Sequence, residues 1–251
     1  MPTAIISDIH ANLEALQVVI EHIDTQTVDR VLCLGDILGY GPNPVECVDL
    51  VAERCEWSLM GNHDFGVLYE PTNFNVAAEQ AAYWTRAQFE AVSDNGKAAS
   101  RWEFLGRLRV RVCDGDFLCV HGSPRRPINE YLFPEDALSS PVKMQQIFER
   151  VDKYCLVGHT HVPGVFTDEP DFYPPGDLSG VYRLTDGEKA IINPGSVGQP
   201  RDLDPRAAYA IIDDDRVEFF RLEYDVEAVV GKIHAIPELN DWLGERLKEG
   251  R

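Results

Sequence analysis

Short apolar runs, each followed by a polar motif, recur along this chain. They are TAIISDIH (3–10), VLCLGDILG (31–39), WSLMGNHD (57–64), FLCVHGSP (117–124), YCLVGHTH (154–161) and AIINPGSVG (190–198). Continuous apolar runs of this length are typical of strands covered on both faces, although periodicity alone does not exclude buried helix. The pattern predicts buried strands that end in loops rich in Gly, Asp, His or Asn.

Two helical patterns lie between the early runs. The first covers 12–23 with Asn12 as its expected N-cap, and the second covers 44–54 with Pro44 in its first turn. Alternating strands and helices imply right-handed crossovers, which place the C-terminal ends of the strands along one sheet edge. We therefore expect the polar motifs to meet in one crevice at that edge.

The segment 65–112 has a different pattern, because its two helical stretches, 75–92 and 97–108, are rich in Ala and aromatic residues. We interpret it as a small helical cap insertion beside the crevice. Ordinary outer-layer helices explain the same pattern equally well. Since no tandem repeat or low-complexity linker occurs, we predict a single domain over residues 1–251.

After residue 180 the pattern becomes antiparallel. Asp186-Gly187 is a hairpin signal, and the stretch 207–224 predicts two strands around an acidic turn. The tail 225–251 is expected to form a helix that packs on the surface.

Composition narrows the functional classes. Of 251 residues, 44% are apolar and 26% charged, which is ordinary for a soluble globular protein. The 23 Lys and Arg against 42 Asp and Glu give a net charge of −19, which repels polyanions and argues against general nucleic-acid binding. No signal-peptide pattern or apolar run of about 18 residues occurs, and the six cysteines show no CxxC spacing. We expect a cytoplasmic protein with reduced cysteines that does not associate with membranes.

Metal-ligating side chains gather at the predicted strand ends. Five of the seven histidines fall there, together with two aspartates and an asparagine: His10, His63, His121, His159, His161, Asp8, Asp36 and Asn62. His159 and His161 are two residues apart, so in an extended segment they face the same side. Imidazoles mixed with hard oxygen ligands suit Mn, Fe, Co, Ni or Zn better than Ca or Mg alone. Two such ions about 3.5–4 Å apart are the usual arrangement for hydrolysing phosphate esters.

The motifs resemble those of the calcineurin-like metallophosphoesterase superfamily over about residues 3–200. In order they are Asp8-x-His10, Gly35-Asp36-x-x-Gly39, Gly61-Asn62-His63-Asp64, His121-Gly122 and Gly158-His159-x-His161. The stretches GDILGYGPNP, AAYWTRAQ, VHGSP and INPGSVGQPR are similar to the bacterial branch labelled diadenosine-tetraphosphatase-like or predicted phosphodiesterase. The resemblance implies an α/β fold, a four-layer α-β-β-α sandwich of two mixed sheets with flanking helices.

The resemblance also implies two transition-metal ions, with manganese favoured. The first ion would be held by Asp8, His10, Asp36 and His161, and the second by Asp36, Asn62, His121 and His159. Asp36 would bridge them. A water shared by two ions is acidified towards neutral pH and can attack phosphorus in line with the leaving group.

Further residues are assigned around the expected ions. By resemblance His63 would face the phosphoryl oxygens or the leaving group as a catalytic residue, with Asp64 fixing its tautomer. Arg125, Arg126 and Arg201 follow site loops and are candidates to bind a second phosphate, with solvated surface arginines as the equal alternative. Four aromatic residues are candidates to stack on a base, although core packing is the commoner fate: Phe74, Tyr83, Trp84 and Tyr131.

Departures from the family bear on the substrate. The protein phosphatases of the superfamily carry phosphate-binding arginines in regions that here read Gly39-Tyr40-Gly41 and Ser58-Leu59-Met60, and the motif ends in Asp64 instead of Glu. We therefore predict a dinuclear phosphoesterase of small phosphorylated molecules, with nucleotides as the best candidates. The alternatives are a non-catalytic metal-binding scaffold on the same fold and a nuclease.

Overall fold

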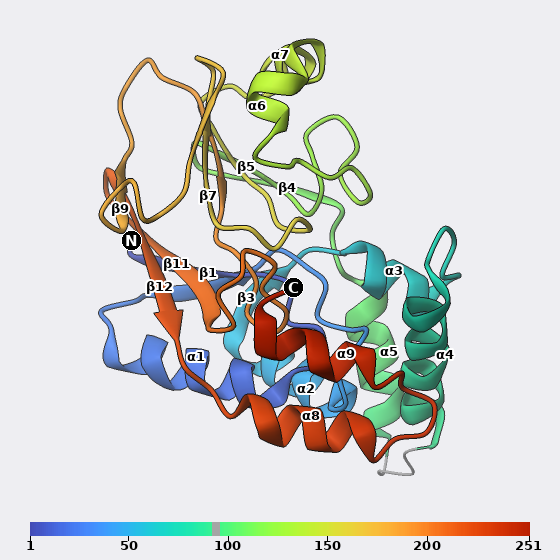
Figure 1. Cartoon of the computed structure of the whole chain (residues 1–251). Helices are drawn as coiled ribbons and strands as arrows, with labels where there is room; N and C mark the ends of the chain where they lie inside the picture. Colours follow the sequence, from blue (N-terminus) through green and yellow to red (C-terminus); the bar gives the residue numbers. More distant parts are fainter. Residues whose placement is uncertain (92–95) are drawn as a thin grey trace.

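Two six-stranded mixed sheets lie face to face with helices on their outer sides (Figure 1). The computed structural model describes residues 1–91 and 96–251. The first sheet has the order β3-β2-β1-β11-β12-β9 and the second β4-β5-β6-β10-β7-β8. This arrangement confirms the predicted α/β sandwich of two mixed sheets.

The first sheet contains β1 (Thr3–Ile6), β2 (Arg30–Cys33), β3 (Cys55–Ser58), β9 (Val181–Arg183), β11 (Ala207–Asp213) and β12 (Arg216–Leu222). The second contains β4 (Arg111–Asp114), β5 (Phe117–Val120), β6 (Tyr154–Leu156), β7 (Gly164–Thr167), β8 (Asp171–Tyr173) and β10 (Ala190–Asn193). Within each sheet three strands are parallel, β1-β2-β3 and β5-β6-β10. The six apolar runs of the sequence thus form the parallel strands, and their C-terminal ends carry the polar motifs.

The described helices are α1 (Leu13–Thr25), α2 (Pro44–Arg54), α3 (Asn62–Leu68), α4 (Val76–Ala91), α5 (Lys97–Gly106), α6 (Asp136–Ser139), α7 (Pro141–Phe148), α8 (Val226–His234), α9 (Trp242–Glu245) and the 3₁₀ helix η1 (Arg246–Glu249). Asn12 caps α1 as expected, since its side chain accepts a hydrogen bond of 3.1 Å from the Ala15 amide.

The core has three apolar layers, as the alternation of side chains along β1 illustrates. Ile5 packs between the sheets with Leu156 and Ile192 of the second sheet. Its neighbour Ile6 faces the other way and packs against Leu16 of α1. Successive side chains of a strand point to opposite faces, so a strand apolar at every position is buried on both. A further apolar cluster joins the second sheet to α6 and α7, which completes the four layers.

Two local predictions after residue 180 are wrong. The Asp186-Gly187 turn does not close a hairpin, because β9 pairs with β12 of the first sheet whereas β10 pairs with β6 and β7 of the second. The tail 225–251 is not one helix: α8 ends at His234, Pro237 follows, and α9 and η1 resume from Trp242. Proline lacks an N–H and disfavours helical backbone before it, which explains the break.

The segment 65–112 belongs to the outer helical layer and also reaches the site. Helices α4 and α5 contact α2 and α3, and Phe89 and Leu105 are buried in the same cluster as α1 and α2. The residues that lead into α4 line a cavity over the polar motifs. Position 92, the predicted end of α4, lies outside the described residues. Whether this segment acts as a cap stays a prediction.

Candidate metal centre

The predicted ligands converge at one edge of the sandwich. Asp8 and His10 follow β1, Asp36 follows β2, Asn62 begins α3, His121 follows β5, and His159 and His161 follow β6. Ligand atoms of one group lie within 4.8 Å of one another: Asp8, His10, Asp36 and His161. A second group meets the same limit: Asp36, His121 and His159. The structure thus brings together all the predicted Asp and His ligands, with Asp36 in both groups.

Several buried atoms of this cluster have no hydrogen-bond partner among the described residues. They are Asp36 Oδ2, Asn62 Oδ1, His121 Nε2 and His159 Nε2. His121 Nε2 and Asp36 Oδ2 are 3.2 Å apart, but they do not have hydrogen-bond geometry. Buried polar atoms are rarely left unsatisfied in folded proteins. These four atoms are the donor atoms predicted for the second ion, so the residues present fit a metal.

Backbone carbonyl oxygens contact the Nδ1 atoms of three of the histidines and so hold their rings in place. The Nδ1 atoms of His10 and His121 are 3.0 Å and 2.9 Å from the carbonyl oxygens of Leu38 and Leu34. The Nδ1 of His161 lies 2.5 Å from the Gln199 carbonyl. A proton on Nδ1 leaves the Nε2 lone pair free for a metal, the usual arrangement of metal-binding histidines. In the first group, His10 Nε2 and His161 Nε2 face each other at 3.1 Å.

The backbone of the cluster is strained. Five predicted ligands have left-handed backbone conformations, with φ of 53° at Asp8, 50° at His10, 52° at Asp36, 65° at His159 and 63° at His161. Such conformations are uncommon for non-glycine residues, cost about 1–3 kcal/mol each, and concentrate at functional sites. The folded chain therefore tolerates unfavourable backbone conformations at these positions, and they direct the side chains into the cluster.

Asp36 is oriented by the neighbouring motif. Its Oδ1 accepts a hydrogen bond of 2.8 Å from the His63 amide, which leaves Oδ2 free. Gly61 packs directly against it, since a Cβ at this position would lie 2.0 Å from Asp36 Oδ1. Only glycine fits here, which gives the Gly-Asn-His-Asp motif a steric reason.

Electrostatics also favour a cation at this point. Although burial alone raises the pKa of Asp8 and Asp36, the adjacent imidazoles, His161 for Asp8 and His121 for Asp36, bring both values below the ordinary range. Burial lowers the pKa of His121, but the two carboxylates outweigh it and raise the value to about 9. In the protein without metal, the two buried carboxylates therefore keep His121 protonated. A bound metal ion would supply that positive charge instead.

His63 and Asp64 differ from prediction in one respect. His63 lies beside the ligands, 4.9 Å from His10 between ring centroids, and burial lowers its pKa to about 4. Asp64 does not orient it, because the two Asp64 oxygens accept hydrogen bonds of 3.0 Å from the amides of Leu38 and Gly61. His63 Nδ1 has no hydrogen-bond partner among the described residues. The predicted tautomer role of Asp64 is thus wrong; it ties two motif loops together.

The three predicted arginines divide into two kinds. Arg125 is paired with Glu130 and Gln146, and the side chain of Arg126 is exposed with no polar contact among the described residues. Arg201 lies close enough to the centre for its charge to lower the pKa of His63 and His161. Of the three, Arg201 is the one whose charge acts on the ligand cluster.

A cavity of about 280 Å³ opens over the cluster. Its lining contains no Asp, Glu, Lys or Arg side chain: Tyr40, Asn62, His63, Thr72, Asn73, Phe74, Asn75, Ala78, Asn129, Tyr131 and His159. Tyr131 stacks on His159 with centroids 3.8 Å apart, and Phe74 lies 4.6 Å from His63. Phe74 and Tyr131 were expected here, whereas Tyr83 and Trp84 do not line the cavity. Tyr40, Thr72, Asn73, Asn75 and Asn129 carried no sequence signal.

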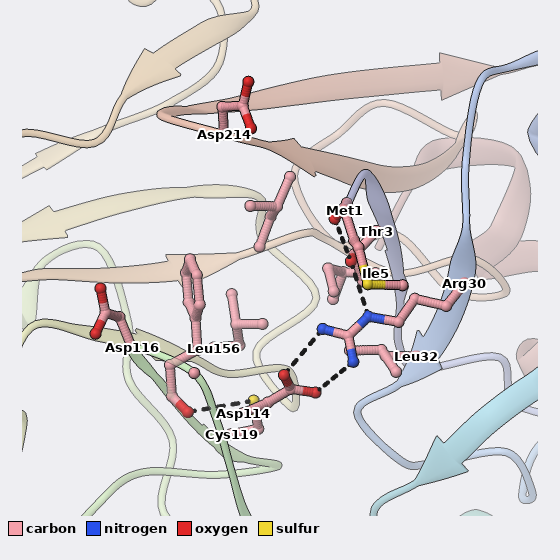
Figure 2. A pocket seen from close by; sticks show the side chains of 13 residues that line it. Met1, Thr3, Ile5, Arg30, Leu32, Asp114, Asp116, Cys119, Leu156 and Asp214 are labelled. Atoms are coloured by element: carbon pink, nitrogen blue, oxygen red, sulfur yellow. Dashed lines mark hydrogen bonds and ion pairs between the residues drawn. The ribbon is translucent and has the colours of Figure 1, made fainter.

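Another cavity, of about 310 Å³, lies between the sheets at the opposite strand ends (Figure 2). Arg30 donates two hydrogen bonds of 2.9 Å to the Asp114 carboxylate at its wall, and Trp57 donates a third bond to that group. These charges are paired with each other, and none of the motif residues lines this cavity. The candidate site is therefore the cavity at the C-terminal strand ends.

Comparison with known proteins agrees with this geometry. Residues 1–216 match the model of the calcineurin-like phosphoesterase superfamily domain. The chain belongs to that superfamily. An uncharacterised protein of Methanocaldococcus jannaschii, MJ0912, is 38% identical over 99% of this chain and 98% of its own length.

Two solved structures are also similar. A metallophosphoesterase from Sphaerobacter thermophilus is 40% identical with a TM-score of 0.84, and each chain is covered completely. The hypothetical protein PH1004 from Pyrococcus horikoshii OT3 is 18% identical with a TM-score of 0.77, covering 100% of this chain and 98% of its own, and shows the shared fold. Family membership supports a phosphoester hydrolase that uses divalent metal ions. Among the described residues no helix is long and apolar enough to cross a membrane.

Proposed function

We propose that this protein hydrolyses phosphodiester or phosphomonoester bonds of small phosphorylated molecules, nucleotides above all, at a dinuclear metal centre. The observation that supports it most directly is that Asp36 Oδ2, His121 Nε2 and His159 Nε2 are buried without a hydrogen-bond partner among the described residues, in a group whose ligand atoms lie within 4.8 Å of one another. A purely structural cluster would be expected to satisfy those atoms within the protein. Manganese is the favoured ion of the proposal, as the family resemblance implies, and the mixture of imidazoles with carboxylates is compatible with it.

The protein's part in this chemistry is positioning. Asp8, His10, Asp36 and His161 would hold one ion and Asp36, Asn62, His121 and His159 the other. Such ions supply positive charge for the phosphoryl oxygens and lower the pKa of water. The Asp36 carboxylate, held at Oδ1 by the His63 amide, presents its Oδ2 to His121 Nε2 at 3.2 Å and to His10 Nε2 at 3.7 Å.

His63 acts on the phosphoryl group or the leaving group as a neutral ring. With a pKa near 4 it carries no charge at pH 7, because burial penalises the imidazolium. A neutral imidazole still donates one N–H hydrogen bond, which stabilises charge that develops on oxygen in the transition state. Its ring is held by Tyr40 and Phe74, with centroids 4.3 Å and 4.6 Å away.

The organic part of the substrate would occupy the uncharged cavity. Aromatic faces at Phe74 and Tyr131 suit a planar ring, and amides such as Asn73 and Asn129 suit hydroxyl or base edges. A volume of about 280 Å³ is at the small end of ligand sites, which favours one nucleoside over a macromolecule. The proposal includes a cytoplasmic location and a small-molecule partner, in keeping with free cysteines and the net charge of −19.

The test is hydrolysis of bis-p-nitrophenyl phosphate and p-nitrophenyl phosphate by metal-stripped protein before and after reconstitution with Mn²⁺. The proposal predicts turnover that requires Mn²⁺, and the faster substrate indicates the diester or monoester preference. If reconstituted protein with metals bound turns over neither ester, nor any of a panel of nucleotides, the scaffold alternative replaces the proposal.

A further inference from the structure

The arginine Arg201 reaches towards the metal centre without a carboxylate partner. Its Nε and Nη2 donate to Gln199 Oε1 at 3.2 Å and 2.6 Å, and no ion pair with any described residue accompanies them. The same Gln199 carries the carbonyl beside His161 Nδ1, and the Arg201 amide donates to the His161 carbonyl at 3.3 Å. The loop that orients a metal-binding histidine therefore also positions this guanidinium.

A second arginine, Arg246, comes from the C-terminal segment. It begins η1, lies over the Trp242 ring at 4.4 Å, and donates from Nε to the main-chain oxygen of Arg251, the last residue of the sequence. It too forms no ion pair with an Asp or Glu side chain of the described residues. Arg246 lies beyond residues 1–216, the part of the chain that matches the family domain. No motif of the sequence pointed to it.

Packing holds the C-terminal segment against the site. Leu243 and Leu247 are buried in one apolar cluster with Tyr40, whose ring lies 4.3 Å from His63 and 4.8 Å from His10. The Leu203 amide, two residues after Arg201, donates to the Gly250 carbonyl at 3.0 Å. Figure 1 shows the C-terminus near the centre of the molecule, beside the loops that follow the strands. The segment thus brings Arg246 to the loop of Arg201 and to Tyr40.

The two guanidinium groups repel each other. Burial and the charge of Arg201 together lower the pKa of Arg246 to about 10, and Arg201 and Arg246 also act on the Tyr40 hydroxyl. Two like charges held close together in the folded chain cost free energy. In a chain with a net charge of −19, Asp and Glu side chains are abundant, yet none of the described ones pairs with either guanidinium. A bound anion would remove that cost.

We propose that Arg201, Arg246 and the Tyr40 hydroxyl form an anion subsite beside the metal centre, which binds a second phosphate of the substrate. The proposal rests on the phosphoesterase function proposed above and names its substrate class: molecules with two phosphate groups, such as nucleoside diphosphates or bisphosphates. Guanidinium groups match phosphate oxygens with paired N–H donors. The Tyr40 hydroxyl makes no hydrogen bond with the described residues and is available as a further donor. The uncharged cavity, which Tyr40 also lines, is left for the organic group.

The test measures binding of non-hydrolysable probes to Mn²⁺-loaded protein by titration calorimetry. The probes are methylphosphonate, with one anionic group, and alkylene diphosphonates with one to four carbons between two such groups. We expect one diphosphonate to bind about tenfold or more tightly than methylphosphonate, beyond the twofold statistical advantage of two equal groups. Arg246→Gln should remove this advantage and leave methylphosphonate binding unchanged, and Arg201→Gln should remove it as well.

Controls separate the subsite from the fold and from catalysis. Arg183→Gln removes an exposed arginine that is paired with Asp215, and it should keep the full preference for the diphosphonate. Arg246→Lys keeps the charge and should retain part of the preference, and thermal melts show whether each variant is folded. Equal binding of all probes to wild type, or a preference that survives in Arg246→Gln, overturns the subsite. Because the probes are not hydrolysed, the result is independent of whether the esterase assay succeeds.

Discussion

At the scale of single residues, the sequence predicted which residues form the ligand cluster, but it did not predict their backbone conformations. The spacing of His159 and His161 indicated a shared direction, and the structure places them in the two groups that share Asp36. The left-handed backbone at these positions has no sequence signature, because strain of this kind is imposed by the surrounding loops. The role of Asp64 was likewise missed, since a carboxylate beside a histidine in sequence bonds to two amides in space.

Replacing the shared ligand tests the assignment most simply. Asp36→Asn removes one negative charge from both ligand groups, so we expect metal affinity to fall by more than the roughly 10–100-fold typical of an outer-sphere change, and turnover to disappear. Metal content by mass spectrometry and ester hydrolysis measure both. The control Asp214→Asn changes an exposed aspartate in a turn. Wild-type metal content and activity in Asp36→Asn would show that this residue is not a ligand.

The role of His63 in hydrolysis can be tested separately from metal binding. His63→Ala should retain both ions but hydrolyse esters about 10²–10⁴-fold more slowly, because a hydrogen bond to the reacting group is lost. With the His63 pKa near 4, the ring is neutral throughout pH 6–8, so the ratio of wild-type to variant rates should stay constant there. A ratio that falls as pH rises through about 6.5 would mean that the imidazolium form is the active one.

The protonation of His121 makes metal binding depend on pH. In the metal-free protein its pKa of about 9 keeps the ring protonated at pH 7, whereas a metal ligand must be neutral. Binding should therefore release a proton from His121, and apparent affinity should increase as pH rises towards 9. Calorimetric Mn²⁺ titrations in two buffers with different ionisation enthalpies measure the proton count. Identical enthalpies in both buffers would contradict this account, and His121→Gln should lose the released proton.

At the scale of elements, predictions succeeded where local pattern and tertiary structure agree. The buried parallel strands and α1 with its Asn12 cap follow from apolar runs and capping chemistry. The Asp186-Gly187 turn has the residues of a hairpin, but its flanking strands join different sheets. Which sheet a strand enters depends on long-range pairing that a local turn signal does not contain.

At the same scale, the close packing of Gly61 in the turn before α3 leads to a testable prediction. Gly61→Ala places a Cβ 2.0 Å from Asp36 Oδ1 and 2.4 Å from the Asp36 amide, so backbone has to move. We expect about 1–3 kcal/mol of destabilisation together with loss of metal. In Gly106→Ala, at the end of α5, the new Cβ meets no atom within 4 Å, and stability should stay level or rise. Thermal melts and metal content compare the two; normal metal binding by Gly61→Ala would refute the steric argument.

At the scale of the whole molecule, the order of the motifs and the strand-helix alternation predicted the sandwich and its functional edge. The C-terminal segment was predicted only as a surface helix, because the contacts of Leu243 and Leu247 with Tyr40 depend on distant packing. Residues that approach the site through such packing, Arg246 among them, leave no motif in the sequence.

The net charge of the whole chain leads to a prediction about nucleic-acid binding. At −19 the protein should not bind duplex DNA or RNA in gel-shift assays, even at low ionic strength where electrostatic attraction is strongest. Salt-sensitive binding of either would reopen the nuclease alternative.

The central claim is that two ions act together in one site. Stepwise titration of metal-stripped protein with Mn²⁺, followed by calorimetry and by hydrolysis of bis-p-nitrophenyl phosphate in the same samples, tests it most directly. The account predicts two ions bound per chain, with turnover that rises only as the second ion binds. Full turnover at one ion per chain, or turnover without added metal, would contradict it.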